Sequence, residues 1–132
     1  MKDLAVIDPN LLAIIKSSFT TEGVLPMPFV KEIFLIECKV AGTSYLNLSE
    51  IEPNLLIDEI LLTRREPENQ FDEFAILILT QKGEKLGYVP RNQNEILARL
   101  MDAGKLILAK IVDKKWVGNW LNITMSVFMR DF

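Results

Sequence analysis

The residues best suited to chemistry lie in one short segment, residues 64–76, which combines charged, amide and aromatic side chains. It reads Arg-Arg-Glu-Pro-Glu-Asn-Gln-Phe-Asp-Glu-Phe-Ala-Ile. Pro67 and Asn69 favour a tight turn, because proline restricts the backbone and an asparagine side chain can bond nearby backbone groups. Asp72 can accept hydrogen bonds from the amides of that turn. The carboxylates here could hold Mg²⁺, but a solvated turn is the simpler interpretation.

A second group places aromatic side chains among cations. Residues 113–120 read Asp-Lys-Lys-Trp-Val-Gly-Asn-Trp and are predicted to be a loop, which carries Trp116, Trp120 and two lysines. Aromatic side chains exposed beside cations suit either a nucleic acid or a protein surface.

Several chemistries are excluded by composition. The chain has no histidine, which removes Ser-His-Asp triads, Cys-His pairs and histidine-ligated metals. The single cysteine, Cys38, lies in an apolar run and is predicted to be a small buried hydrophobe. Neither a GxxxxGK[ST] nor a GxGxxG phosphate loop occurs. We therefore expect no catalytic residue, no metal and no cofactor.

Length and charge narrow the class of protein further. The 132 residues suit one domain with a short extension, and the start has no signal-peptide pattern. The apolar runs fall short of the ~20 residues that span a membrane, so we expect a cytoplasmic protein. The net charge of -3 argues against a protein that coats duplex DNA. The charge divides into -7 over residues 1–80 and +4 over 81–132, which indicates a polar partner for the second half unless the fold interleaves the two.

Residues 1–30 are predicted to be a helical extension and linker. Asp8 and Pro9 are typical of a helix start, and apolar side chains share one helical face through Phe19. Residues 23–28 contain one glycine and two prolines, which end the helix. Because so short an apolar helix is marginal alone, it must pack on the main domain or on a second copy, and a homodimer is one expectation.

Residues 31–132 are predicted to be mainly β with one helix. The expected strands are 31–41, 56–64, 74–79, 85–89, 106–112 and 121–128, with a hairpin turn at 81–84. Asn92 or Asn94 can cap a helix that ends at Gly104. Its predicted apolar face consists of Ile96, Leu97, Leu100 and Met101. Short strands with one helix favour a small closed barrel, since closure removes open sheet edges.

The order and spacing of these motifs resemble the HIRAN domain family. The family pattern is a Val-x-Gly step, an Arg-Glu/Asp-Pro-x-Asn-Pro-Tyr/Phe-Asp-x-x-Ala-Ile block, and a Gly-Tyr/His-hydrophobic-Pro-Arg segment before a helix. The resemblance covers about residues 31–130. The matching positions are Val40, Gly42, Tyr45, Arg65, Glu66, Pro67, Asn69, Asp72, Ala75, Ile76, Gly87, Tyr88, Pro90 and Arg91.

The resemblance implies a six-stranded OB-like or SH3-like β-barrel, with a helix after strand 4, that binds single-stranded DNA at its 3′ end. It implies that Tyr45 and Phe71 stack on the terminal bases and that Asp72 reads the terminal hydroxyl. It also implies that Asn69 shapes the same turn, and Trp120 best matches a further aromatic of the family. The alternative for Tyr45 and Phe71 is barrel core, and the alternative for Asp72 is a purely local role in its turn.

Charge, rather than a family motif, indicates that Lys82, Lys85 and Arg91 meet the phosphates. Two positions depart from the family. Gln70 stands where proline is usual, and Ser44 stands where a basic residue precedes the pocket aromatic. These departures predict a looser turn and one phosphate contact fewer.

The leading hypothesis is a non-catalytic module that binds single-stranded DNA 3′ ends in DNA repair or replication-fork processing, with a helicase or nuclease partner in trans. The alternative is a protein-interaction or dimerisation module that uses residues 1–30 and the tryptophan-bearing loop.

Overall fold

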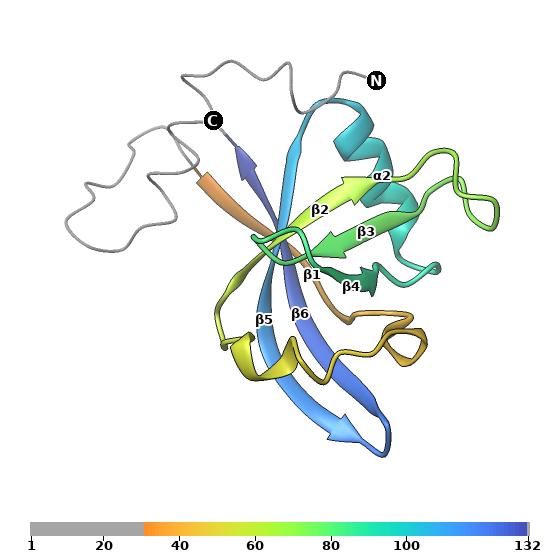
Figure 1. The fold of residues 1–132 in the computed structure, drawn as a ribbon. Coiled ribbons are helices and arrows are strands. Elements are labelled where there is room, and N and C mark those ends of the chain that lie inside the picture. Colours follow the sequence, from red (N-terminus) through yellow and green to blue (C-terminus); the bar gives the residue numbers. More distant parts are fainter. Residues whose placement is uncertain (1–30, 132) are drawn as a thin grey trace.

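Six antiparallel strands and one helix form the fold in a computed structural model that describes residues 31–131 (Figure 1). The strands are β1 (Lys31–Lys39), β2 (Ile60–Arg65), β3 (Ile76–Leu79), β4 (Lys85–Tyr88), β5 (Leu106–Val117) and β6 (Trp120–Asp131). Helix α2 (Asn94–Asp102) follows β4, and two 3₁₀ turns, η2 (Thr43–Tyr45) and η3 (Glu52–Asn54), lie between β1 and β2. The predicted mainly β class and the helix after strand 4 are confirmed. The predicted N-terminal helix lies outside the described residues.

The strands make one curled sheet in the order β1-β6-β5-β2-β3-β4. Successive side chains of a strand point to opposite faces, so every second residue enters the core. Helix α2 adds Leu97 and Ala98 to this core. The inward strand residues include Leu61, Ile76, Ile78, Ile107, Ala109, Ile111, Leu121, Ile123, Met125 and Val127.

The residues after β1 close the curled sheet at one end. The Val40 amide donates to the Ile123 carbonyl at 2.9 Å, so the chain still runs beside β6. Ala41 and Tyr88 then exchange two backbone hydrogen bonds of 2.7 and 2.9 Å, which join this segment to β4. Within residues 31–131, the predicted closed barrel is therefore a curled sheet whose two ends are joined only by the bridge between Ala41 and Tyr88.

The predicted loop at 113–120 is wrong. β5 and β6 continue as a long hairpin in which Trp116 pairs with Leu121 and Val117 pairs with Trp120. Only Gly118 and Asn119 form the turn, with a positive φ of 60° at Gly118. Glycine followed by asparagine suits a two-residue hairpin turn. Residues 113–117 look like a polar loop in sequence, but they form a strand because they pair with residues 120–124.

Two predicted boundaries also need correction. The second strand begins at Ile60 and not at residue 56, because Asp58 has a positive φ of 70° and the Glu59 carboxylate accepts the Leu56 amide at 3.0 Å in a local turn. Helix α2 has Gln93 at its N-cap without a side-chain bond, so neither predicted asparagine caps it. Ile96 is exposed, whereas Leu97 and Ala98 face the core.

Two smaller expectations are confirmed. Gly104 ends the helix: its amide donates to Met101 and the Lys105 amide donates to Leu100, with a positive φ at the glycine. Cys38 is buried, and this burial, with the nearby Glu37 charge, raises the pKa of its thiol to about 11. No helix of residues 31–131 is long and apolar enough to cross a membrane.

Candidate nucleic-acid interface

The loop between β2 and β3 is organised by one asparagine. The Asn69 Oδ1 accepts the amides of Phe71 at 2.9 Å and Asp72 at 3.2 Å, and its Nδ2 donates to Glu66 Oε1 at 3.2 Å. These bonds occupy the polar groups of the turn, and the Phe71 ring is left 81% exposed. Asn69 therefore shapes the turn that presents Phe71, and Phe71 is not a core residue.

Arg65 fixes this loop to the helix. Its guanidinium is buried and bonds Asp102 through Nε at 3.0 Å and Nη2 at 3.3 Å. The same group donates to the carbonyls of Ala75 at 2.7 Å and Glu73 at 2.9 Å, at the far end of the loop. A planar guanidinium with five donors is suited to such a junction. Sequence reasoning placed Arg65 in the family motif without finding this role.

Asp72 is held on two sides. Its Oδ1 accepts the Phe74 amide at 2.9 Å, and its Oδ2 accepts Asn94 Nδ2 at 2.6 Å. Asn94 is buried at the start of α2, where a helix cap was predicted instead. Each carboxylate oxygen has two lone pairs and accepts one of these bonds, so each can still accept one more donor.

Tyr45 is presented by a separate turn. Gly42 adopts a positive φ of 81°, η2 follows, and the Tyr45 ring is 90% exposed. The alternative that Tyr45 belongs to the barrel core is excluded by this exposure. The turn directly follows Ala41, whose bridge to Tyr88 holds it beside β4.

Tyr88 links the two aromatic-bearing loops. Its backbone pairs with Ala41, and its hydroxyl donates to Glu66 Oε1 at 2.7 Å, the oxygen that also binds Asn69. Figure 1 shows the loop after β1 and the loop after β2 projecting on the same side of the molecule, with the end of β4 between them. The structure thus gathers Tyr45, Asn69, Phe71 and Asp72 around one strand end.

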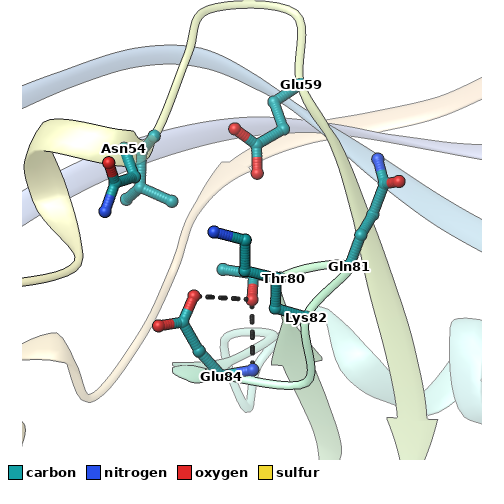
Figure 2. A pocket seen from close by; sticks show the side chains of 7 residues that line it. Asn54, Glu59, Thr80, Gln81, Lys82 and Glu84 are labelled. Carbon is teal, nitrogen blue, oxygen red and sulfur yellow. Dashed lines mark hydrogen bonds between the residues drawn. The ribbon is translucent and has the colours of Figure 1, made fainter.

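The three predicted phosphate contacts do not lie together. Lys85 Nζ sits 5.1 Å from the centre of the Tyr88 ring, and Arg91 is exposed three residues after Tyr88. Lys82 lies in the turn between β3 and β4, just before Lys85 and at the opposite end of the β3–β4 hairpin from Tyr88 and Arg91. It lines a cavity of about 240 Å³ with the carboxylates of Glu59 and Glu84 (Figure 2).

Trp120 lies on the long hairpin, apart from the loop that carries Phe71 (Figure 1). Its side chain is 37% exposed at the start of β6, three residues before Ile123, which binds Val40. The same hairpin carries a feature that sequence reasoning missed. Lys114 Nζ pairs with the Glu52 carboxylate, and this bond, with a weaker one from Trp116, lowers the pKa of Glu52.

The interface carries charges of both signs. Glu66, Glu68 and Glu73 share the loop with Phe71, while Lys85 lies over the ring of Tyr88, whose hydroxyl bonds Glu66. Within residues 31–131, no three histidine, cysteine or acidic side chains are grouped as metal ligands would be. The arrangement can stack planar groups and accept a hydrogen bond at Asp72.

Comparison with known proteins places this geometry in a family. The family model of the HIRAN domain matches residues 33–130. A crystal structure of a Lactobacillus plantarum protein superimposes with a TM-score of 0.71 at 25% identity, over 78% of this chain and 99% of that one. The HIRAN domain of human HLTF gives a TM-score of 0.59 at 18% identity, over 76% of this chain and 79% of that one, and shares the fold. No curated protein matches the sequence significantly. The match over three quarters of its length shows that the chain belongs to the HIRAN domain family.

Proposed function

We propose that this chain is a non-catalytic module that binds single-stranded DNA, preferentially at a 3′ end, and that it serves DNA repair or replication-fork processing with a helicase or nuclease partner. HIRAN domains are nucleic-acid-binding modules, which supports the general class. The observation that carries the proposal is the pair of aromatic rings, 90% and 81% exposed, that two ordered turns hold in solvent on one side of the molecule.

Binding would combine two interactions, the stacking of bases on aromatic rings and a hydrogen bond to the terminal hydroxyl. Tyr45 and Phe71 would stack on successive bases, each with about 1–3 kcal/mol and little sequence preference. Asp72 would accept a hydrogen bond from a terminal hydroxyl and would repel a terminal phosphate. Arg91 would attract the backbone near the site, and Lys85 would attract the backbone farther from the strand end.

Fluorescence anisotropy with matched oligonucleotides tests this proposal. The chain should bind a single strand with a 3′ hydroxyl more tightly than one with a 3′ phosphate. Tyr45→Ala and Phe71→Ala should each weaken binding about tenfold, whereas Phe34→Ala, which removes another exposed ring on β1, should not. Asp72→Asn should reduce the discrimination between the two ends. Binding weaker than about 100 μM at low salt, or equal binding of both ends, would reject end recognition.

A second candidate is a protein-interaction surface on the long hairpin. Large apolar side chains there and in the neighbouring loop are exposed: Leu56, Ile57, Val112, Trp116 and Val117. The Asp58 amide bonds the Ile111 carbonyl at 2.7 Å, which holds this loop against β5. Light scattering of the chain with and without Ile57→Asp tests whether this surface joins two copies.

A further inference from the structure

We propose that the outer face of β2, β3 and β4 carries the backbone of the bound single strand, with Arg64, Lys85 and Tyr88 as its contacts. This inference rests on the proposed function and adds the path of the strand beyond its terminal bases.

The strand register places these side chains on one face. Arg64 pairs with Leu77, Leu77 pairs with Tyr88, and directly paired residues share a face. Ile76 and Ile78, on either side of Leu77, belong to the core, so this row points outward. In Figure 1 helix α2 lies behind β2 and β3, so the face of these strands toward the viewer is the one away from the helix.

The row begins at the proposed end site. The Tyr88 hydroxyl bonds Glu66, in the loop that presents Phe71 and Asp72. Neighbouring strands are about 4.8 Å apart, so Arg64 lies roughly 10 Å from Tyr88 across β3. A strand whose last bases stack on the two loops can therefore continue over this face without a bend into the core.

The charge of the face is available to a ligand. Lys85 pairs with Leu79 beside the row and lies over the Tyr88 ring. Leu77 and Leu79 are buried, so a ligand on this face would meet the cationic side chains and Tyr88 rather than the apolar side chains of β3. Among residues 31–131, the ion pairs shorter than 4 Å leave Arg64 and Lys85 unengaged. The cations they do engage are Arg65, Arg99, Lys110, Lys114 and Arg130.

The test compares two double variants of equal charge. Arg64→Gln with Lys85→Gln removes both charges and leaves polar side chains, and Lys105→Gln with Lys115→Gln does the same at two exposed lysines elsewhere. Affinity for a 3-mer and a 20-mer single strand is measured by anisotropy between about 50 and 200 mM salt. We expect the first double variant to bind the 20-mer about tenfold more weakly, with the salt slope reduced by about 1.4, and to bind the 3-mer, which ends before it reaches the outer face, nearly as before. The Lys105→Gln and Lys115→Gln control should keep the wild-type salt slope. The single variant Arg64→Lys, which keeps the positive charge, should bind the 20-mer with most of the wild-type affinity.

The outcomes separate the two proposals. The path over the outer face is wrong if both double variants lose the same affinity. It is also wrong if the first double variant keeps the wild-type salt slope while Phe71→Ala still weakens binding. In both cases the proposed binding of the strand end by Tyr45, Phe71 and Asp72 stands. If the wild-type chain binds no oligonucleotide, both proposals fail. Tighter binding of an acidic peptide than of the 20-mer would show that the outer face of β2, β3 and β4 is not a nucleic-acid site. Equal melting temperatures of the variants confirm that folding is not the cause.

Discussion

The adjacent residues Arg64 and Arg65 point to opposite faces of β2. Strand alternation turns Arg65 inward, where it is 8% exposed, and turns Arg64 outward. The inward arginine joins β2, the following loop and α2 through four hydrogen bonds. The position of the exposed Phe71 in that loop therefore depends on a buried arginine.

Arg65→Ala is expected to lower the free energy of unfolding by about 2–3 kcal/mol, because it removes charge-assisted bonds to two carbonyls and to Asp102. It should also loosen the loop, so the Phe71 amide exchanges its hydrogen faster. Urea unfolding and hydrogen exchange measure both effects. Arg64→Ala, one residue away, is the control and should change stability by less than about 0.5 kcal/mol. Equal losses in the two variants would contradict the assigned roles.

At the scale of elements, closure of the sheet depends on a close approach between β4 and the segment after β1. A Cβ on Gly87 would lie 2.3 Å from the Ala41 carbonyl oxygen, and Gly87 has a φ of +150°. Only glycine fits there. The same approach places the Tyr45 turn beside Tyr88, so this glycine links the fold to the candidate site.

Gly87→Ala is expected to destabilise the domain by about 3 kcal/mol, from steric overlap and backbone strain together. Gly83→Ala is a matched control, since Gly83 also has a positive φ but its Cβ would meet nothing within 4 Å. The control should cost about 1 kcal/mol. Thermal unfolding compares them, and a similar loss in both would show that β4 can move away from Ala41.

The long hairpin is tied to η3 by Glu52. Lys114 donates to the Glu52 carboxylate and to its carbonyl at 2.7 Å, and Trp116 Nε1 lies 3.4 Å from the carboxylate. The Lys114 bond is the main cause of the lowered pKa of Glu52. Because the folded-state pKa is below the unfolded one, this contribution is present above the unfolded value of about 4.5 and is lost as pH falls through the folded value.

Glu52→Gln should therefore be less stable than the wild type at pH 7, and the difference should shrink as the pH falls below about 4. Chemical denaturation at several pH values measures it, with tryptophan fluorescence as the probe. Glu50→Gln serves as the control, since Glu50 is exposed. A difference that is independent of pH would show that the ion pair does not contribute.

At the scale of the whole molecule, the charge divides along the chain but the fold interleaves the two parts. Glu66 of the β2–β3 loop accepts the Tyr88 hydroxyl, and Lys85 of β4 lies over the same ring, so acidic and basic residues from the two parts of the chain meet at Tyr88. Such a surface favours weak, short-site binding over the coating of a duplex.

The described core lies between residues 38 and 127, so residues 31–132 are expected to fold without the first 30. The shortened chain should unfold cooperatively, with a melting temperature within about 5 °C of the full chain. Calorimetry measures this, and light scattering of both forms tests the expected homodimer through residues 1–30. A full-length dimer that becomes a monomer would support that dimer, and a shortened chain that fails to fold would show that residues 1–30 complete the core.

Local signals in the sequence determined much of this protein. Alternating apolar residues predicted the strands, Gly104 predicted the helix end, and the Pro67–Asp72 turn chemistry predicted a tight loop, because each depends on near neighbours in the chain. The spacing of the motif residues also identified the family.

Tertiary structure decided which side chain each motif residue meets. The Arg65–Asp102 pair, the Asp72–Asn94 bond and the contact of Gly87 with Ala41 join residues at least 22 positions apart, which no local pattern reports. The long hairpin at 106–131 likewise depends on pairing between strands. Exposure of Tyr45 and Phe71 was undecided for the same physical reason: an aromatic residue suits core and surface equally, and only the packing of distant segments selects between them.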